Sequence, residues 1–331
     1  MLDLIVAQLV NGITLGGMYA LIALGYTLVY GILLMINFAH SELFMCGAFV
    51  GLGVMTLLTS SAITQNVAWL GWLAPAQQFF TSGTVGMICM LAIVFLVSAI
   101  VVGIMGVIIE RLAYRPLRHA PRLAPLISAV GVSIFLQNAV LLWVSSSQVP
   151  FPNPFGNSVA FTIGSTDVSV LKVVIVVTAI VLMVGLDQFI SHSRMGKAMR
   201  ATAQSHDLAG LMGVNVDRVI AFTFALGSGL GAIAGVMLIL YYGIGHYFMG
   251  FMLGLKAFTA AVLGGIGNVQ GAMLGGLLLG VIESLASGYI GDLTGGVFGS
   301  NYRDVFAFLV LIFVLVLRPS GLMGQKSGDR A

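Results

Sequence analysis

The stretch ERLAYRPLRHAPR, residues 110–122, decides how this chain is organised. It contains Arg111, Arg115, Arg118 and Arg122, whereas residues 1–110 contain no lysine or arginine and are rich in Leu, Ile, Val, Met, Phe and Gly. Short cytoplasmic loops of membrane proteins collect Lys and Arg close to the membrane spans. The stretch therefore predicts a membrane protein in which this first basic loop is cytoplasmic.

The composition supports the same class. Of the 331 residues, 59% are hydrophobic and 8% are charged, against about 25% charged residues in soluble domains, and the mean hydropathy is +1.07. A soluble protein is therefore excluded. The 14 basic and 11 acidic residues form no patch for nucleic acid, because the bases gather at the ends of apolar runs, where they report topology.

Eight apolar runs approach or exceed the ~20 residues that cross a bilayer. They predict an all-α, polytopic inner-membrane helical bundle, with residues 1–331 forming one transmembrane domain. The first run is not expected to be a cleaved signal peptide, because it lacks a basic n-region, carries Asp3 and continues into further spans. The runs are 5–24, 42–58, 84–109, 123–143, 170–190, 219–241, 254–282 and 304–317.

Eleven of the 14 cations fall into three clusters that we expect on one side of the membrane. Three apolar runs separate the second cluster from the third, yet a shared side requires an even number of crossings. The run 254–282 is therefore expected to enter, turn and leave by the same side, with a broken helix near 264–271. The clusters are Arg111, Arg115, Arg118 and Arg122; Arg194, Lys197, Arg200 and Arg218; Arg318, Lys326 and Arg330. Lys172, Lys256 and Arg303 remain for the opposite face.

Another break is predicted near 36–42, where the polar run NFAHSE interrupts an apolar stretch. Sliding this region by 229 positions onto the break near 264–271 sets Gly47 on Gly276 and Gly51 on Gly280, although chance matches among 43 glycines leave the repeat open. Paired broken segments mark the central pathway of many transporters. The N-terminus lies outside if each of the first three runs crosses once, and a re-entrant first break would change that.

Glycines recur every four residues in three places. On a helix this spacing creates a smooth stripe that a neighbouring backbone can approach closely. We predict packing surfaces here, with the lining of a narrow path as the alternative. The glycines are Gly47 and Gly51; Gly227, Gly231 and Gly235; Gly267, Gly271 and Gly275.

Two acidic residues are candidates for chemistry within the membrane. Charged groups in mid-bilayer are costly and by default mark a functional site, which points to Glu42, with the nearby His40, and to Glu283. The alternative is an interfacial position for both carboxylates. Cys46 and Cys89 lie in apolar runs and predict buried free thiols.

The sequence gives no sign of an enzyme. GGIGNVQG resembles a dinucleotide loop but has Gln270 where a third glycine is required, and the chain contains no GxxxxGK[ST] phosphate loop. The five histidines lack metal-ligand spacing. We therefore predict no bound metal or cofactor, and any ATP that drives the protein would be hydrolysed by another chain.

The segment SHSRMGKAMRATAQSHDLAGLMGVNVDR, residues 191–218, is too polar to span a membrane. Good helix formers run from Arg194 to Leu211, and Gly213 is a typical helix stop. We expect a short amphipathic helix on the cytoplasmic side. Such a helix either lies on anionic lipid or docks into a cytoplasmic partner.

Six blocks of this chain resemble one transporter family almost from end to end. They resemble the H-type permeases of branched-chain amino acid ABC transporters, and several blocks are specific to that family. The blocks are GYTLVYGILLMINFAHSE, ERLAYRPLR, ISAVGVSIFLQN, SRMGKAMRATAQ, LMGVNVDRVIAFTFALG and KAFTAAVLGGIGNVQGAMLGG. Family members often have Gly after the His of NFAH, where this chain has Ser41, so the turn at the first break is left open.

The resemblance implies a set of partners. These are a second, M-type permease, two cytoplasmic ATPases that hold ATP and Mg²⁺, and a periplasmic binding protein that docks around 59–82, 145–169 and 284–303. Residues 191–218 would form the coupling loop that an ATPase moves. Its candidate coupling residues are Arg194, Lys197, Arg200, Ala203, Asp207 and Gly213.

The resemblance also implies alternating access for leucine, isoleucine and valine. The pathway would be mostly apolar, with a few polar groups for the ammonium and carboxylate. Its candidate residues are Tyr26, Tyr30, Asn37, His40, Glu42, Thr259, Gly264, Gly267 and Asn268. The alternatives are a permease for urea, short amides or other amino acids and, more distantly, an independent channel, a secondary carrier or an intramembrane enzyme.

Overall fold

The computed structural model describes residues 2–35, 37–60, 74–118, 120–121, 123–156, 158–295 and 302–324. Seven of its helices are long and apolar enough to cross a membrane, and two shorter apolar helices accompany them. The prediction of an all-α polytopic bundle is confirmed. Arg122, Lys326 and Arg330, and parts of all three predicted docking loops, lie outside the described residues.

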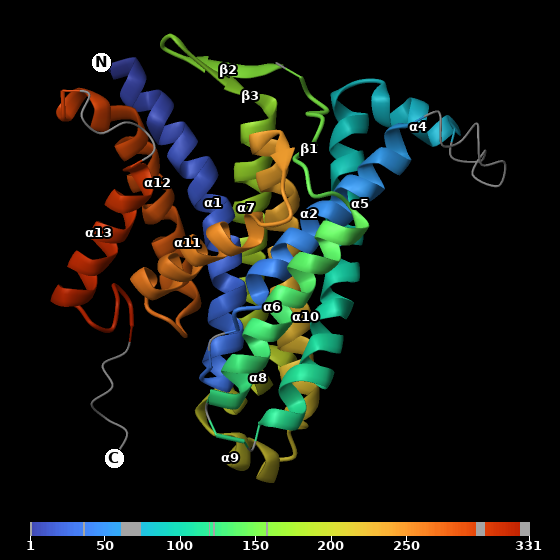
Figure 1. The fold of residues 1–331 in the computed structure, drawn as a ribbon, viewed down its shortest axis with the longest axis vertical. Coiled ribbons are helices and arrows are strands. Elements are labelled where there is room, and N and C mark those ends of the chain that lie inside the picture. Colours follow the sequence, from blue (N-terminus) through green and yellow to red (C-terminus); the bar gives the residue numbers. More distant parts are fainter. Residues whose placement is uncertain are drawn as a thin grey trace.

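The eight predicted runs correspond to nine helices, because the run 254–282 is divided between two of them (Figure 1). The membrane-length and short apolar helices are α1 (Leu2–Leu33), α2 (His40–Thr59), α5 (Thr84–Ile109), α6 (Leu123–Trp143), α7 (Val170–His192), α10 (Val216–Tyr242), α11 (Met249–Gly264), α12 (Val269–Leu293) and α13 (Arg303–Leu317). The smaller elements are α4 (Ala74–Thr81), α8 (Arg194–Gln204), α9 (His206–Leu211), the π-helical turn η2 (Glu110–Tyr114) and the 3-10 turn η3 (Arg115–Leu117).

Four short strands lie between the helices. β2 (Val159–Ile163) and β3 (Thr166–Ser169) form an antiparallel hairpin before α7. β1 (Val149–Pro150) pairs antiparallel with β4 (Ile244–Gly245), which ties the segment after α6 to the segment after α10. The hairpin lies at the end of the molecule opposite α8 and α9 (Figure 1).

The described parts of the three basic clusters lie at one end of the bundle, which we call the basic end. Arg118 of the first cluster donates to Asp217, next to Arg218 of the second, at 2.6 Å. The segment after Arg318 lies at the same end. It is held to the turn before α12 by Asn268, which donates to the carbonyl of Met323 at 2.9 Å. Gln270, two residues further on, donates to Asp187 near the end of α7. The N-terminus lies at the opposite end (Figure 1).

The first break places a helix start inside the bundle. α1 ends at Leu33, and α2 begins at His40, whose ring fills the space beside Gly25. Gly25 lies eight residues before the end of α1, or about 12 Å along the helix. The chain therefore turns back into the bundle before α2 starts, which confirms the predicted break near 36–42. Leu34 makes the turn with a left-handed φ of 54°.

The second break joins two antiparallel helices. Gly264 packs against Gly271, and Gly275 packs against Ala260, so α11 and α12 form a hairpin around the turn at 265–268. Gly265 and Gly267 adopt φ values of +107° and +92°, which other residues rarely adopt. The broken helix near 264–271 is confirmed. α10, α11, α12 and α13 alternate in direction, which gives the even number of passes that the basic clusters require.

The helices pack in a different arrangement from the repeat that the sequence left open. α10 leaves the basic end where α1 arrives, and α11 then begins beside the start of α2, with Gly250 and Gly254 against Ser41. α2 and α5 both pack on α10, while α11 and α12 both pack on α1. The helices α1, α2, α5 and α6 thus match α10, α11, α12 and α13 in an inverted repeat. Its counterpart to the first break is 243–248, not 264–271.

Most of the predicted packing glycines lie against a neighbouring helix. An added Cβ would meet backbone or side-chain atoms at these positions, so the close approaches depend on glycine. Gly267 differs, because it lies in the turn before α12 and has open space around it. The contacts are Gly47 with Ala232, Gly51 with Val236, Gly227 with Gly25, Gly231 with His40, Gly235 with Phe44, Gly271 with Gly264 and Gly275 with Ala260.

Candidate functional site

The N-termini of α2, which has 20 residues, and of α11, which has 16, meet inside the bundle, and we call this contact the junction. A Cβ on Gly250 would lie 2.7 Å from the carbonyl oxygen of Ser41, and Gly254 lies against the Ser41 side chain. Helix N-termini carry free N–H groups and the positive end of the helix dipole. Two such ends within a membrane protein form a suitable site for an anionic group.

Glu42 lies in the first turn of α2, at the junction, and is fully buried. Its Oε1 accepts hydrogen bonds from Gln137 Nε2 at 2.8 Å and from Ser133 Oγ at 3.2 Å. Its Oε2 has no hydrogen-bond partner among the described residues. Because Ser133 is the middle residue of α6, Glu42 lies deep in the bundle, and the interfacial alternative is wrong for this residue.

Aromatic rings cover one side of the junction. The Tyr26 ring stands edge-on to His40 at a centroid distance of 4.8 Å and to Phe258 at 5.9 Å. A cavity lined by Tyr26, Tyr30, Phe258, Ala261 and Ile266 has an accessible volume of about 10 Å³, which is roughly the space of one water molecule. A leucine side chain does not fit into this cavity.

Two other candidates lie near the junction but point elsewhere. Asn37 is buried, and its Oδ1 accepts a hydrogen bond from the Tyr114 hydroxyl at 2.5 Å. Thr259 is buried on α11, and its hydroxyl donates to the carbonyl of Leu255, one turn earlier, at 2.8 Å. Asn37 therefore connects the first break to η2, whereas Thr259 satisfies its own helix.

Gly264, Gly267 and Asn268 do not lie at the junction. Gly264 lies ten residues beyond Gly254, or roughly 15 Å along α11, and Ile266 of the same turn lines the cavity next to Tyr26 and Tyr30, so these residues lie beyond the junction, toward the basic end. Asn268 Oδ1 accepts from the amide of Gly271 at 3.1 Å, which caps the first turn of α12. These residues shape the turn between α11 and α12.

Sequence reasoning missed four residues at the junction. Ser133 and Gln137 lie four residues apart in an apolar helix and so share one face, which is the signal that would have revealed them. Gly250 and Gly254 have the same spacing on α11. Which helix faces Glu42 depends on tertiary packing, which the spacing does not specify.

A buried ion cluster joins four helices near the middle of the bundle. Lys256 Nζ lies 2.7 Å from Glu283 on α12 and 2.7 Å from Asp304 on α13. The hydroxyl of Tyr19, halfway along α1, donates to Glu283 at 3.0 Å. Lys256 was expected at the opposite face and Glu283 had an interfacial alternative. Both residues are buried against an opposite charge and neither is exposed at a surface of the bundle.

The loop between α7 and α10 forms two helices instead of the single one expected through Leu211. Ser193 accepts from the amide of Gly196 at 2.8 Å and caps α8. Ser205 accepts from the amide of Leu208 at 3.3 Å, which ends α8 and begins α9. A serine that can cap a helix competes with helix continuation, and this effect divides the segment. Gly213 ends α9 with a φ of +83°.

The predicted coupling residues have different environments. Arg194, Lys197, Asp207 and Gly213 are exposed at the basic end. Arg200 donates to the carbonyls of Ile190 and Ser191 at the end of α7, and Ala203 packs against the core. Arg200 is exposed but tied to the end of α7, and Ala203 is half-buried, so both residues hold the loop in place.

An exposed apolar surface accompanies these charges. Leu208, Leu211 and Met212 are 65%, 83% and 84% exposed. They lie in and just after α9, at the basic end (Figure 1). A group of bare apolar side chains rimmed by charged ones is typical of a surface that binds another protein or a membrane.

Comparison with known proteins places the chain in a family. Residues 8–315 match the family described as the permease component of branched-chain amino acid transport systems. The chain is 44% identical over 330 residues to the high-affinity branched-chain amino acid transport system permease protein LivH of Escherichia coli, covering 98% of this chain and 96% of the relative. It is 43% identical over 328 residues to LivH of Salmonella typhimurium, with coverages of 98% and 96%.

A third relative gives the same result. The permease protein BraD of Pseudomonas aeruginosa, from a high-affinity branched-chain amino acid transport system, is 44% identical over 326 residues, or 98% of this chain and 97% of the relative. No solved structure matches the chain. These matches cover nearly the whole chain, which forms a multi-pass helical bundle. The chain therefore belongs to the family of permease components of branched-chain amino acid transport systems.

Proposed function

We propose that this chain is the H-type permease subunit of an ATP-driven importer that carries leucine, isoleucine and valine across a bacterial inner membrane. The observation that carries the proposal is identity of 43–44% along nearly the whole chain to LivH and BraD. The basic end would face the cytoplasm, as the positive-inside rule requires. The β2–β3 hairpin would then face the periplasm.

The importer would contain further subunits. An M-type permease would lie beside this chain, two ATPases would bind ATP and Mg²⁺ at the cytoplasmic face, and a periplasmic protein would deliver the amino acid. The hydrolysis of ATP falls to those partners, because this sequence contains no phosphate-binding loop. The chain itself would act as a transport subunit and not as an enzyme.

The junction is the part of this chain that we propose touches the substrate. A branched-chain amino acid carries a carboxylate and an ammonium. The N–H groups at the starts of α2 and α11 suit the carboxylate, and the free Oε2 of Glu42 suits the ammonium. Tyr26 and Phe258 would contact the apolar side chain. His40, packed against Tyr26, would set the ring's position.

Transport would require the junction to open. The cavity beside it holds about one water molecule, so the route for an amino acid would form at the contact with the second permease. Binding and hydrolysis of ATP would alternate which end of that route is open. The exposed Leu208, Leu211 and Met212, with Arg194 and Lys197, would dock on an ATPase and transmit its motion.

A reconstitution experiment tests the proposed function. The chain would be purified with its partner subunits, placed in liposomes that enclose ATP, and supplied with its native binding protein and radiolabelled substrates. We expect ATP-dependent uptake of leucine, isoleucine and valine. Uptake of urea or a short amide in their place would favour that alternative. Uptake by the chain alone, without ATPase subunits, would identify a channel or secondary carrier.

A further inference from the structure

The first break lies between the basic end and the junction. The described part of this segment, residues 34–35 and 37–39, lies between the end of α1 and His40, two residues before Glu42. Leu34 holds a φ of 54°, which is a strained backbone conformation for leucine, and its side chain is 63% exposed. Strained residues of this kind cluster at sites that switch between conformations.

One polar link joins the α8–α9 loop to this break. His206, the first residue of α9, places its Nε2 2.8 Å from the carbonyl oxygen of Ile32. Ile32 lies in the last turn of α1, two residues before Leu34. Any displacement of α9 would therefore pull or release the end of α1 next to the break.

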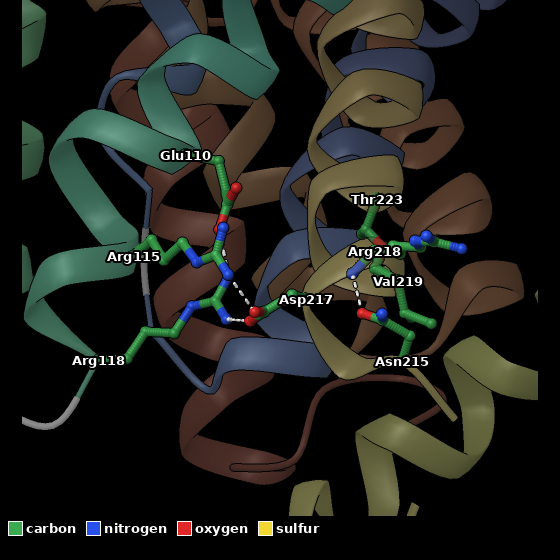
Figure 2. A network of polar contacts seen from close by, with 8 residues as sticks. All are labelled: Glu110, Arg115, Arg118, Asn215, Asp217, Arg218, Val219 and Thr223. Carbon is green, nitrogen blue, oxygen red and sulfur yellow. Dashed lines mark hydrogen bonds and ion pairs between the residues drawn. The ribbon is translucent and has the colours of Figure 1, made fainter. Parts of the chain in front are cut away.

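A second link runs through charged residues, as Figure 2 shows. Asp217, in the first turn of α10, lies four residues beyond Gly213 and pairs with both Arg115 and Arg118. Arg118 also pairs with Glu110, whose side chain is 2% exposed. Two cations and two carboxylates balance in this network, so it forms a neutral clamp between the start of α10 and the end of α5.

The clamp continues to the break through η2. Glu110 is the first residue of this π-helical turn, and Tyr114 is its last. Tyr114 packs against Phe224 of α10 at a centroid distance of 5.3 Å and donates to Asn37, inside the break, at 2.5 Å. π-helical turns are rare and are frequently found at functional sites.

We infer that the break at 34–39 is the element that receives motion of the α8–α9 loop, through His206 on one side and through Asp217, Arg118, Glu110 and Tyr114 on the other. This inference rests on the proposed function, in which partner ATPases move that loop. The moved break shifts the start of α2 against Gly250 of α11 and so opens or closes the junction. His206, Asp217 and Tyr114 are positioning residues, because they act on the junction through the backbone of the break.

The test uses the purified complex with all its subunits in liposomes. Three substitutions interrupt the links: Asp217→Asn and Tyr114→Phe, which change the side-chain volume little, and His206→Ala, which removes an exposed ring. Two controls lie in the same region: the residue next to Asp217, and a second histidine. Arg218 points away from the clamp (Figure 2), so Arg218→Gln leaves the clamp intact, and His192→Ala removes a histidine of α7 that reaches only Gln188 of its own helix. The measurements are complex yield, basal ATPase activity, and leucine imported per ATP hydrolysed.

We expect the three link variants to import about two- to thirtyfold less leucine per ATP, the range in which residues along such networks change coupling. Their yield and basal ATPase activity would equal those of the wild type, as would every property of the two controls. An unchanged ratio in all three variants, or a loss that merely follows a loss of yield, would overturn the inference. Failure of the wild-type complex to import leucine would instead overturn the proposed function.

Discussion

Among single residues, glycines at the helix contacts determine how closely the central helices approach one another. Gly250 and Gly254 bring the start of α11 against Ser41, and Gly235 brings α10 against the backbone of Phe44. Lipid provides little hydrophobic driving force between helices, so van der Waals contact at small residues carries much of their association. Glycines at these contacts are therefore expected to tolerate no larger residue, whereas glycines facing open space are expected to tolerate alanine.

Gly254→Ala tests this expectation, because its Cβ would collide with the side chain of Ser41. Overpacking of this kind costs about 1–3 kcal/mol, and we expect a lower melting temperature and reduced uptake. The control Gly185→Ala, in open space on α7, is expected to be neutral or stabilising by up to about 1 kcal/mol. Adding Ser41→Gly to Gly254→Ala is expected to restore the melting temperature. No restoration would mean that the collision is not the cause.

Glu42 provides the second test at this scale. Glu42→Gln keeps the bonds to Ser133 and Gln137 possible but removes the negative charge. A hydrogen bond to a charged group contributes about 1.5–3 kcal/mol, so we expect the substrate concentration for half-maximal uptake to rise roughly 10- to 100-fold, at unchanged complex yield. Asp3→Asn, which neutralises an acid at the start of α1, is the control. Equal uptake curves for Glu42→Gln and wild type would remove Glu42 from the pathway.

At the scale of elements, the ion cluster holds α13 on the α11–α12 hairpin. A buried ion pair contributes little net stability, but removing one partner leaves an uncompensated charge and costs about 3–5 kcal/mol. Lys256→Met is therefore expected to lower the melting temperature strongly, because it removes the buried ammonium that lies 2.7 Å from both Glu283 and Asp304. Combining it with Glu283→Gln and Asp304→Asn is expected to recover most of the loss. Lys172→Met, which breaks only a bond to Asn11, is the milder control.

In the α8–α9 loop, the residues that stabilise the loop differ from those that we propose contact the ATPase. Arg200→Gln removes the donor to the last carbonyls of α7, where a cation typically contributes about 0.3–1 kcal/mol, so a small loss of thermal stability is expected. Lys197→Glu lies on the exposed face and is expected to leave stability unchanged but to reduce recovery of the ATPase subunits in a pull-down. The opposite pattern would mean that Arg200, and not Lys197, contacts the partner.

The sequence predicted the two breaks well but not what they face. The break near 264–271 followed from charge counting, and the break near 36–42 followed from polar residues within an apolar run. The match between the two breaks did not reflect equivalent positions. Gly276 and Gly280 pack on α1, whereas Gly47 and Gly51 pack on α10, so the two pairs share only the property of being glycines at helix contacts. An inverted repeat is defined by the directions of the helices and by which helices pack together, and residue spacing carries little information about either.

For the molecule as a whole, the proposed orientation in the membrane depends on an asymmetric distribution of positive charge. Clustered arginines and lysines mark one end of the bundle, and the sequence alone predicted that end, together with the number of passes between the clusters. The junction was only partly predicted. Tyr26, His40 and Glu42 meet there, whereas Gly264, Gly267 and Asn268 lie near the basic end. Partners of Glu42 on α6 and α11 depend on how the helices pack, which apolar runs of similar composition do not specify.

Labelling from one side of the membrane tests this arrangement most directly. In a chain whose two cysteines are replaced by Cys46→Ala and Cys89→Ala, one variant carries Leu211→Cys on α9 and another carries Thr162→Cys on the β2–β3 hairpin, both at exposed positions. A membrane-impermeant maleimide added to intact cells is expected to label the hairpin variant, and to label the α9 variant only after the membrane is opened. Labelling of the α9 variant in intact cells would place the basic end outside and contradict the proposed coupling to cytoplasmic ATPases.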